Sequence, residues 1–187
     1  MCQKHEPVID LLLRVQCCGK LEVTVCDANM ESKWFRVFAT VPICAKEVIL
    51  QLPRARVGHA MRSIARTLVG RFCIVRIDIP HASHSGDLRD IFLPLYLEDS
   101  LTESLSLGMH GCTMTAEDIV LFSTVIQKPP SQFHSLSLEI DVTALNDDGL
   151  NCILYSLQQK GLSHFHLTLW TMEHNYVDTY NCLHKHS

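Results

Sequence analysis

The sequence predicts an α/β fold in which strand–helix units repeat along one axis, as a right-handed solenoid with a parallel concave sheet and convex helices. The first of two observations behind this is a set of six segments in which two apolar residues flank one other residue, the pattern of a strand with one buried face. The segments are Val23-Thr24-Val25, Leu50-Gln51-Leu52, Ile77-Asp78-Ile79, Leu105-Ser106-Leu107, Leu136-Ser137-Leu138 and Leu167-Thr168-Leu169. Their first residues are 27, 27, 28, 31 and 31 positions apart, and such regular spacing indicates a repeat.

The second observation is an apolar triad between successive segments, at positions i, i+3 and i+7, which share one face of a helix. The triads are Trp34/Val37/Val41, Met61/Ile64/Leu68, Leu88/Ile91/Leu95, Ile119/Phe122/Ile126 and Leu150/Ile153/Leu157. Each predicts one helix per unit. The triad begins nine residues after the strand in the first three units and twelve after it in the last two. We therefore place a three-residue insertion in the strand-to-helix loop of the later units.

Residues with strong local preferences mark the ends of these elements. Capping and acidic residues precede the triads at Ser85-Gly86-Asp87, Thr115-Ala116-Glu117-Asp118 and Asp147-Asp148, where the free amides of a first helical turn favour them. Pro129-Pro130 and Gly161 fall between a helix and the next strand, where helix-breaking residues belong. A small residue predicts a tight turn three positions after the end of each of the first three strands: Ala28, Ala55 and Ala82.

The chain is predicted to be a single array over residues 1–187. About five repeats occupy residues near 20–170, and residues 1–19 and 171–187 form partial or capping ends. A solenoid needs such ends because its terminal units otherwise expose apolar surface. A helix from Val8 to Val15 is a candidate for the first cap, and the polar residues 171–187 for the second. Alternatively, the array is part of a larger chain and is not capped by its own ends. We favour this second interpretation.

The clearest unit runs from Phe133 to Leu157 and contains Asp148-Gly149-Leu150, followed by Ile153 and Leu157. It resembles the leucine-rich repeat, in particular the ribonuclease-inhibitor-like subfamily and the C-terminal repeats of NOD-like receptors. The resemblance covers residues 20 to 170 and implies a cytosolic innate-immune or regulatory role. The family places Asn or Cys after the strand, where this chain has alanine in three units. The chain also lacks the GxxxxGK[ST] motif of an ATP site.

Composition narrows the function classes. The chain has 16 basic and 20 acidic residues, a net charge of −4, which does not favour nucleic acid or a membrane surface as a partner. Its longest apolar runs are four residues, far short of a membrane span. Nine cysteines, without a CxxC pair or a visible secretory signal, are expected to be reduced core residues. We expect a cytoplasmic location, with the nucleus as an alternative.

Histidine and cysteine suggest a second function class, a small metal-binding protein or thiol-dependent enzyme. His164 and His166 share one side of a strand, and Cys182, His184 and His186 alternate near the end. Cys112 lies near His110, but no catalytic signature surrounds any cysteine. Asp147-Asp148 are better explained as helix-capping residues than as an acid–base pair. We therefore predict no catalytic residues, no metal site, no cofactor and no enzymatic activity.

The remaining candidate site is the concave face, formed by the outward residues of the strands. Those we expect to bind are Thr24, Gln51, Arg76, Asp78, Ser106, Ser137, His166, Thr168 and Trp170. Just beyond these outward residues on the concave face we expect Arg54, His81, Met109, Glu139 and Trp170. Tryptophan is enriched at binding hot spots, although Trp170 can equally cap the array. The sequence thus predicts a non-enzymatic module that binds a protein partner of unknown identity.

Overall fold

A computed structural model describes residues 18–24, 45–51, 67–78, 87–109, 114–141, 143, 145–159, 161–170 and 177–183. Several predicted features lie outside these residues. They include the first helix, Val8 to Val15, and the turn residues Ala28, Ala55 and Ala82. The triad Trp34/Val37/Val41 and two members of the next, Met61 and Ile64, are outside as well.

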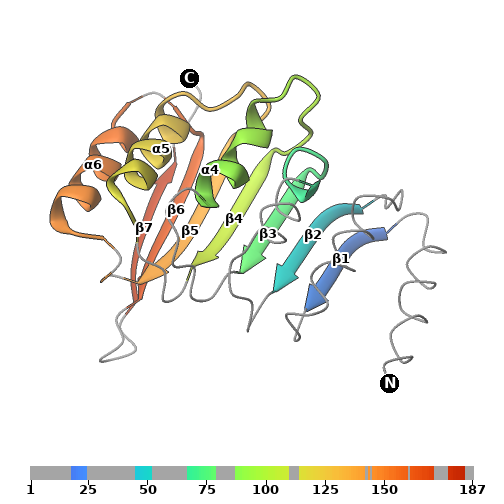
Figure 1. Ribbon diagram of the computed structural model, residues 1–187, viewed down its shortest axis with the longest axis horizontal. Helices are drawn as coiled ribbons and strands as arrows, with labels where there is room; N and C mark the ends of the chain where they lie inside the picture. The colour runs from blue at the N-terminus through green and yellow to red at the C-terminus, as the bar shows by residue number, and fades with distance from the viewer. Residues whose placement is uncertain are drawn as a thin grey trace.

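Seven strands form a single sheet, in the order in which they occur along the chain (Figure 1). The strands are β1 (Cys18–Thr24), β2 (Ala45–Gln51), β3 (Ile74–Asp78), β4 (Ser104–Met109), β5 (Ser135–Asp141), β6 (His164–Trp170) and β7 (Val177–Leu183). Strands β1 to β6 are parallel, and β7 pairs antiparallel with β6. All six predicted strands are confirmed, as is the α/β class. The repeated apolar pattern does not continue into β7, so the sequence does not predict this strand.

The described helices lie on one face of the sheet (Figure 1). They are α4 (Asp87–Phe92), the 3-10 helix η2 (Leu93–Tyr96), α5 (Ala116–Gln127) and α6 (Asp147–Leu157). The triad Leu88/Ile91/Leu95 is buried as predicted, but it is divided between α4 and η2. Pro94, which has no amide hydrogen to donate, occurs in the first turn of η2 and ends the α-helix there.

The starts of α5 and α6 follow from their caps. Thr115 and Asp118 form a capping box, in which the Asp118 amide donates to the Thr115 hydroxyl and the Thr115 amide donates to the Asp118 carboxylate. Asn146 caps α6 by accepting a 2.8 Å hydrogen bond from the Gly149 amide. Asp147 and Asp148 therefore occupy the first turn, as predicted for acidic residues that favour the positive end of the helix dipole.

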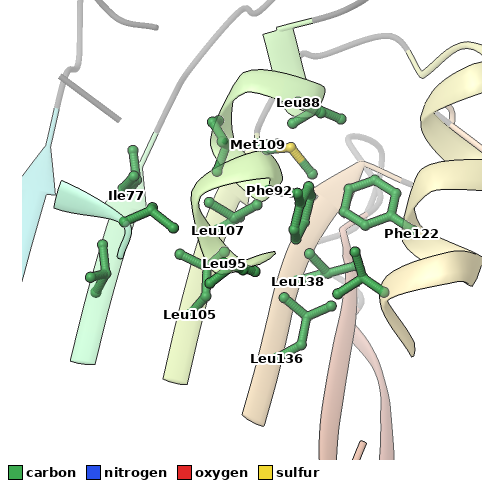
Figure 2. Close-up of a cluster of buried hydrophobic side chains, with 14 of the residues drawn as sticks. Ile77, Leu88, Phe92, Leu95, Leu105, Leu107, Met109, Phe122, Leu136 and Leu138 are labelled. Carbon is green, nitrogen blue, oxygen red and sulfur yellow. The ribbon is translucent and has the colours of Figure 1, made fainter. Parts of the chain in front are cut away.

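The core lies between the sheet and the helices (Figure 2). Each parallel strand contributes alternating apolar residues to it, such as Leu105 and Leu107 of β4 and Leu136 and Leu138 of β5, all fully buried. Phe92 of α4 and Phe122 of α5 meet edge-to-face with ring centroids 5.2 Å apart. This contact joins two neighbouring helices above the strands they cover.

The hydrogen-bonded register corrects the predicted alignment of strands. Leu107 of β4 pairs with Ile77 of β3, and Leu167 of β6 pairs with Leu138 of β5, so the pairs expected to correspond are displaced by two residues. The equivalent residues that begin the buried pair in β1 to β6 are Leu21, Val48, Val75, Leu105, Leu136 and Phe165. Their spacings are 27, 27, 30, 31 and 29 residues. Since a two-residue displacement preserves the alternation, the predicted faces of the strands are unaffected.

The same register moves the insertion to the opposite end of the helix. The distance from the last triad residue to the next strand is seven residues from Leu68 to Val75 but ten from Leu95 to Leu105. The strand-to-helix distance barely changes, being eleven residues from Ile77 to Leu88 and twelve from Leu138 to Leu150. The predicted insertion in the strand-to-helix loop is therefore wrong, and the extra residues precede β4.

The longer connection before β4 is tied to the turn before β3. The buried Thr102 hydroxyl donates to the Phe72 carbonyl at 2.8 Å and accepts from the Gly70 amide at 2.7 Å. The Leu101 amide also donates to the Gly70 carbonyl at 2.6 Å. One side chain thus satisfies two backbone groups of the preceding unit.

Gly161 confirms its predicted place between α6 and β6. A Cβ at this position would overlap the carbonyl of Ile126 at the end of α5. The adjacent Leu162 amide donates to that same carbonyl at 3.0 Å. Glycine therefore lets this connection pass directly beneath the preceding helix.

Among the described residues, no helix has the length and apolarity needed to cross a membrane.

Replacing Phe122 with alanine should lower the free energy of unfolding by about 3–5 kcal/mol, because it leaves a cavity against Phe92. Val120 lies two residues away on α5 and is 62% exposed. Val120→Ala should change stability by less than about 0.5 kcal/mol. Urea unfolding monitored by circular dichroism measures both, and equal losses would contradict the described packing of α5.

Replacing Thr102 with valine should cost about 1–3 kcal/mol, because the buried Gly70 amide and Phe72 carbonyl lose their partner while the side-chain shape is kept. Thr102→Ser retains the hydroxyl and is the matched control. The same urea titration compares them. A valine variant no less stable than the serine variant would show that the hydroxyl does not join the two units.

Candidate functional site: the polar face of the sheet

The face of the sheet turned away from α4, α5 and α6, here called the polar face, carries the outward side chains of the strands. Parallel pairing aligns these residues in rows across the sheet. One row contains Glu22, Ile49, Arg76, Ser106, Ser137 and His166. The next contains Thr24, Gln51, Asp78, Gly108, Glu139 and Thr168. Most of these residues are half-buried or exposed, in contrast to the buried rows beneath the helices.

The two rows bring together eight of the nine predicted binding residues. The ninth, Trp170, is half-buried in a third position, where it pairs with Asp141 of β5 and Val177 of β7. Because β7 lies beyond β6, Trp170 is not on the last strand. Whether any of the nine residues contacts a ligand stays a prediction.

Two expected positions change. Met109 is 1% exposed and pairs with Ile140, so it belongs to the rows that face the helices. It lies two residues after the inward Leu107, and a strand that continues regularly keeps both on the same side. Glu139, expected just beyond the outward residues, lies among them, within β5 and in the same row as Asp78 and Thr168. Arg54 and His81 are outside the described residues.

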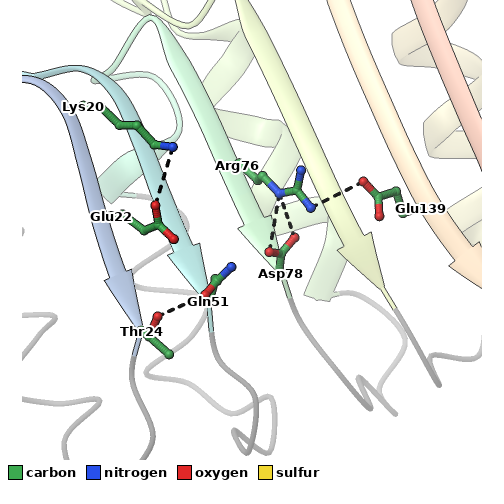
Figure 3. A network of polar contacts seen from close by, with 7 residues as sticks. All are labelled: Lys20, Glu22, Thr24, Gln51, Arg76, Asp78 and Glu139. Atoms are coloured by element: carbon green, nitrogen blue, oxygen red, sulfur yellow. Dashed lines mark hydrogen bonds and ion pairs between the residues drawn. The ribbon is translucent and has the colours of Figure 1, made fainter.

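Arg76 is the centre of the polar face (Figure 3). Its Nε lies 3.2 Å from Oδ1 and 3.4 Å from Oδ2 of Asp78, two residues further along β3. Its Nη2 lies 3.4 Å from Oε1 of Glu139 on β5. The side chains of Arg76, Asp78 and Glu139 are 40%, 24% and 22% exposed. One guanidinium is therefore held between two carboxylates at a partly solvated surface.

Small residues on β4 allow this contact across an intervening strand. Ser106 and Gly108 are the β4 residues paired with Arg76 and Asp78. A Cβ on Gly108 would lie 2.6 Å from Oδ1 of Asp78 and would displace that carboxylate. The absence of a side chain at Gly108 thus leaves room for Asp78, while Arg76 extends over β4 to Glu139.

Further polar contacts occur within and between the rows. The Thr24 hydroxyl donates to Oε1 of Gln51 at 3.0 Å, and Lys20 lies 3.5 Å from Glu22 (Figure 3). On β6, Nε2 of His166 lies 2.9 Å from the Thr168 hydroxyl. The two exposed contacts, Thr24–Gln51 and Lys20–Glu22, contribute little to stability, so these side chains can be used to bind a ligand.

The histidines and cysteines proposed for the alternative function are not gathered into one cluster within the described part of the chain. His134 and His164 have ring centroids 6.3 Å apart, but the described residues contain no group of three or more possible metal ligands. Cys182 pairs with Phe165 of a buried row, whereas His166 belongs to the first polar-face row and His164, paired with Ser135, lies two residues before it on the same side of β6. His110, Cys112, His184 and His186 lie outside the described residues.

Two described cysteines are free thiols, the half-buried Cys73 and the exposed Cys152. Sγ of Cys152 lies 3.3 Å from the hydroxyl of Ser123 on the helix side of the sheet. Arg71, which follows Gly70 before β3, is half-buried with its guanidinium 5.6 Å from the Phe72 ring centroid.

Described residues line cavities on the helix side of the sheet. A cavity of about 610 Å³ lies between the starts of α5 and α6, and one of about 260 Å³ lies beside α5 and includes Arg89 of α4. Val120 lines both. Nearby, the Tyr96 hydroxyl donates to the Lys128 carbonyl at 3.2 Å, and partial burial raises the pKa of Tyr96. Neither cavity coincides with the predicted site.

No protein-family model matches the sequence, and no curated protein or solved structure matches it either.

Replacing Gly108 with alanine should displace Asp78 and break its contact with Arg76. We expect it to lower the stability by about 1 kcal/mol relative to Gly19→Ala on β1, where an added Cβ has no atom within 4 Å. Urea unfolding compares the two alanine variants directly. A Gly108→Ala variant more stable than Gly19→Ala would contradict the described position of the Asp78 carboxylate.

Proposed function

We propose that the chain is a leucine-rich repeat array of the ribonuclease-inhibitor-like subfamily, and that it binds a protein partner on its polar face. Equivalent apolar positions in its six parallel strands are 27, 27, 30, 31 and 29 residues apart. This spacing is about the length of a repeat that contains one strand and one helix. The neighbouring units share their buried rows, as stacked repeats do. This pattern supports a solenoid in which the polar face is the concave side.

The observation that carries the proposed function is the one-sided covering of the sheet. The described helices all lie on one face, and the opposite face presents aligned polar residues across six strands. A broad surface of this kind suits a protein partner better than a small molecule, which usually binds in a deep pocket. Exposed side chains that contribute little to the stability of the fold can be used to bind a partner.

The sequence around α6 supports a more specific proposal. Asp148-Gly149-Leu150, with Ile153 and Leu157, resembles the C-terminal repeats of NOD-like receptors, and Asn146 caps the helix that these residues form. We therefore propose the repeat region of a receptor of this type, with an innate-immune or regulatory role in the cytoplasm or nucleus and within a larger chain. Its role is binding, without a cofactor, nucleic acid, membrane or enzymatic reaction.

The proposal is tested by blocking each face in turn. Ser106→Tyr places a bulky side chain in the centre of the polar face, whereas Val120→Tyr places one on the exposed surface of α5. The tagged full chain and both variants are used for quantitative affinity purification, after circular dichroism has shown that they are folded.

We expect one or more proteins to be recovered with the unmodified chain and with Val120→Tyr, and to be reduced at least about tenfold with Ser106→Tyr, because a clash at the centre of an interface excludes the partner. Recovery that is unaffected by Ser106→Tyr, or is reduced only by Val120→Tyr, would place binding elsewhere. Recovery of no protein above the tag-only background would contradict the proposed function.

A further inference from the structure

The polar face has an excess of negative charge. Its described outward residues include two basic side chains, Lys20 and Arg76, and five acidic ones, a net charge of −3 with neutral histidines. The acidic residues are Glu22, Glu47, Asp78, Glu139 and Asp141, of which Asp141 is buried and the other four are half-buried or exposed. An approaching partner with positive charge is therefore attracted to this face, and one with negative charge is repelled.

The arrangement around Arg76 makes this preference local. Its guanidinium already contacts both oxygens of Asp78 and one oxygen of Glu139, so its charge is neutralised within the face. Two carboxylates share one cation and leave one negative charge over. This position is therefore unsuited to an acidic ligand, which would have to compete with both carboxylates for the same donors.

Arg76 also shows what the two carboxylates can hold. Asp78 on β3 and Glu139 on β5 are separated by one strand, β4. The β4 residue between them is Gly108, which has no side chain to fill the space between the two carboxylates. A planar guanidinium fits across this space, because Arg76 occupies it. At 40% exposure the Arg76 side chain is free to be displaced toward solvent.

We propose that the polar face binds a basic segment of its protein partner, and that an arginine of this segment replaces Arg76 between Asp78 and Glu139. This inference rests on the proposed function and names the chemistry of the partner. The serines at 106 and 137 beside the pair leave room for the incoming chain. Exchange of one guanidinium for another conserves the contacts of both carboxylates, so it costs little.

The experiment uses the whole 187-residue chain and two fluorescent synthetic peptides, nona-arginine and nona-glutamate, with fluorescence anisotropy as the readout. Asp78→Asn combined with Glu139→Gln removes the two carboxylates. Glu98→Gln combined with Asp99→Asn removes two charges from an exposed turn after η2, so it changes the net charge equally. Arg76→Gln removes the resident guanidinium and keeps both carboxylates.

We expect the unmodified chain to bind nona-arginine in preference to nona-glutamate. The Asp78/Glu139 double variant should weaken nona-arginine binding at least about tenfold and the Glu98/Asp99 double variant less than about twofold, because only the first pair makes charge-assisted contacts. Arg76→Gln should tighten nona-arginine binding about threefold or more, since the peptide no longer displaces an internal competitor. This increase is not expected of a residue that merely supports the fold.

Equal weakening by the two double variants would show that nona-arginine responds only to net charge, and would overturn the inference. Preference for nona-glutamate would overturn it too and would indicate an acidic partner that binds Arg76. Weaker nona-arginine binding by Arg76→Gln would also overturn it, because the peptide would then not replace Arg76 between the carboxylates. If these results occur while Ser106→Tyr still abolishes partner recovery, the polar face binds its partner by other chemistry. The proposed function then stands and the basic segment does not.

Discussion

The parallel register of β1 to β6 is the constraint on which the other features of this protein depend. Backbone hydrogen bonds align equivalent residues of neighbouring strands, and the alternation of side chains then separates every strand into inward and outward positions. Inward rows such as Val75–Leu105–Leu136 are fully buried and can be covered only by apolar helix faces. Since the described helices all cover one face, the other is left to polar residues. The candidate site is thus a consequence of how the core is built.

Much of this architecture could be predicted from the sequence, because two periods are written into it. Alternating apolar residues define the strands, and the i, i+3, i+7 triads define the helices that cover them. The register could not be predicted in the same way. Each strand region contains three alternating apolar residues, as in Leu105, Leu107 and Met109, so several alignments two residues apart preserve the same buried face. Only the hydrogen bonds between strands select one of them.

The features that the sequence did not predict have local physical causes. Pro94 interrupts a helix whose apolar spacing continues through the interruption, because Leu95 is buried equally well from a 3-10 turn. Thr102 bonds the longer connection before β4 to the preceding turn, and a single hydroxyl gives no periodic signal in the sequence. Strand β7 pairs with β6 through backbone amides and carbonyls. Because every sequence has these groups, the pairing leaves no pattern of residue types from which β7 could be predicted.

On the polar face, the side of the sheet on which a residue lies could be predicted from the sequence, but its contacts could not. The sequence could place Arg76 and Asp78 on the outward side of one strand, but the contact with Glu139 joins residues on two strands that are not neighbours. It depends on the register and on the missing side chain at Gly108, neither of which is visible in an alternating pattern.

The energetics of the Arg76 contacts bear on their role. Partly exposed ion pairs typically contribute no more than about 1 kcal/mol to stability, because solvent screens them and ordering the side chains costs entropy. The fold therefore does not require Arg76 to remain between Asp78 and Glu139, whereas it does require the buried rows beneath. A contact that costs little to break, at the centre of a face that the helices leave uncovered, can be exchanged for one with a partner. The rigid sheet would keep both carboxylates in place during that exchange, because β3 and β5 are each paired with β4 along their length.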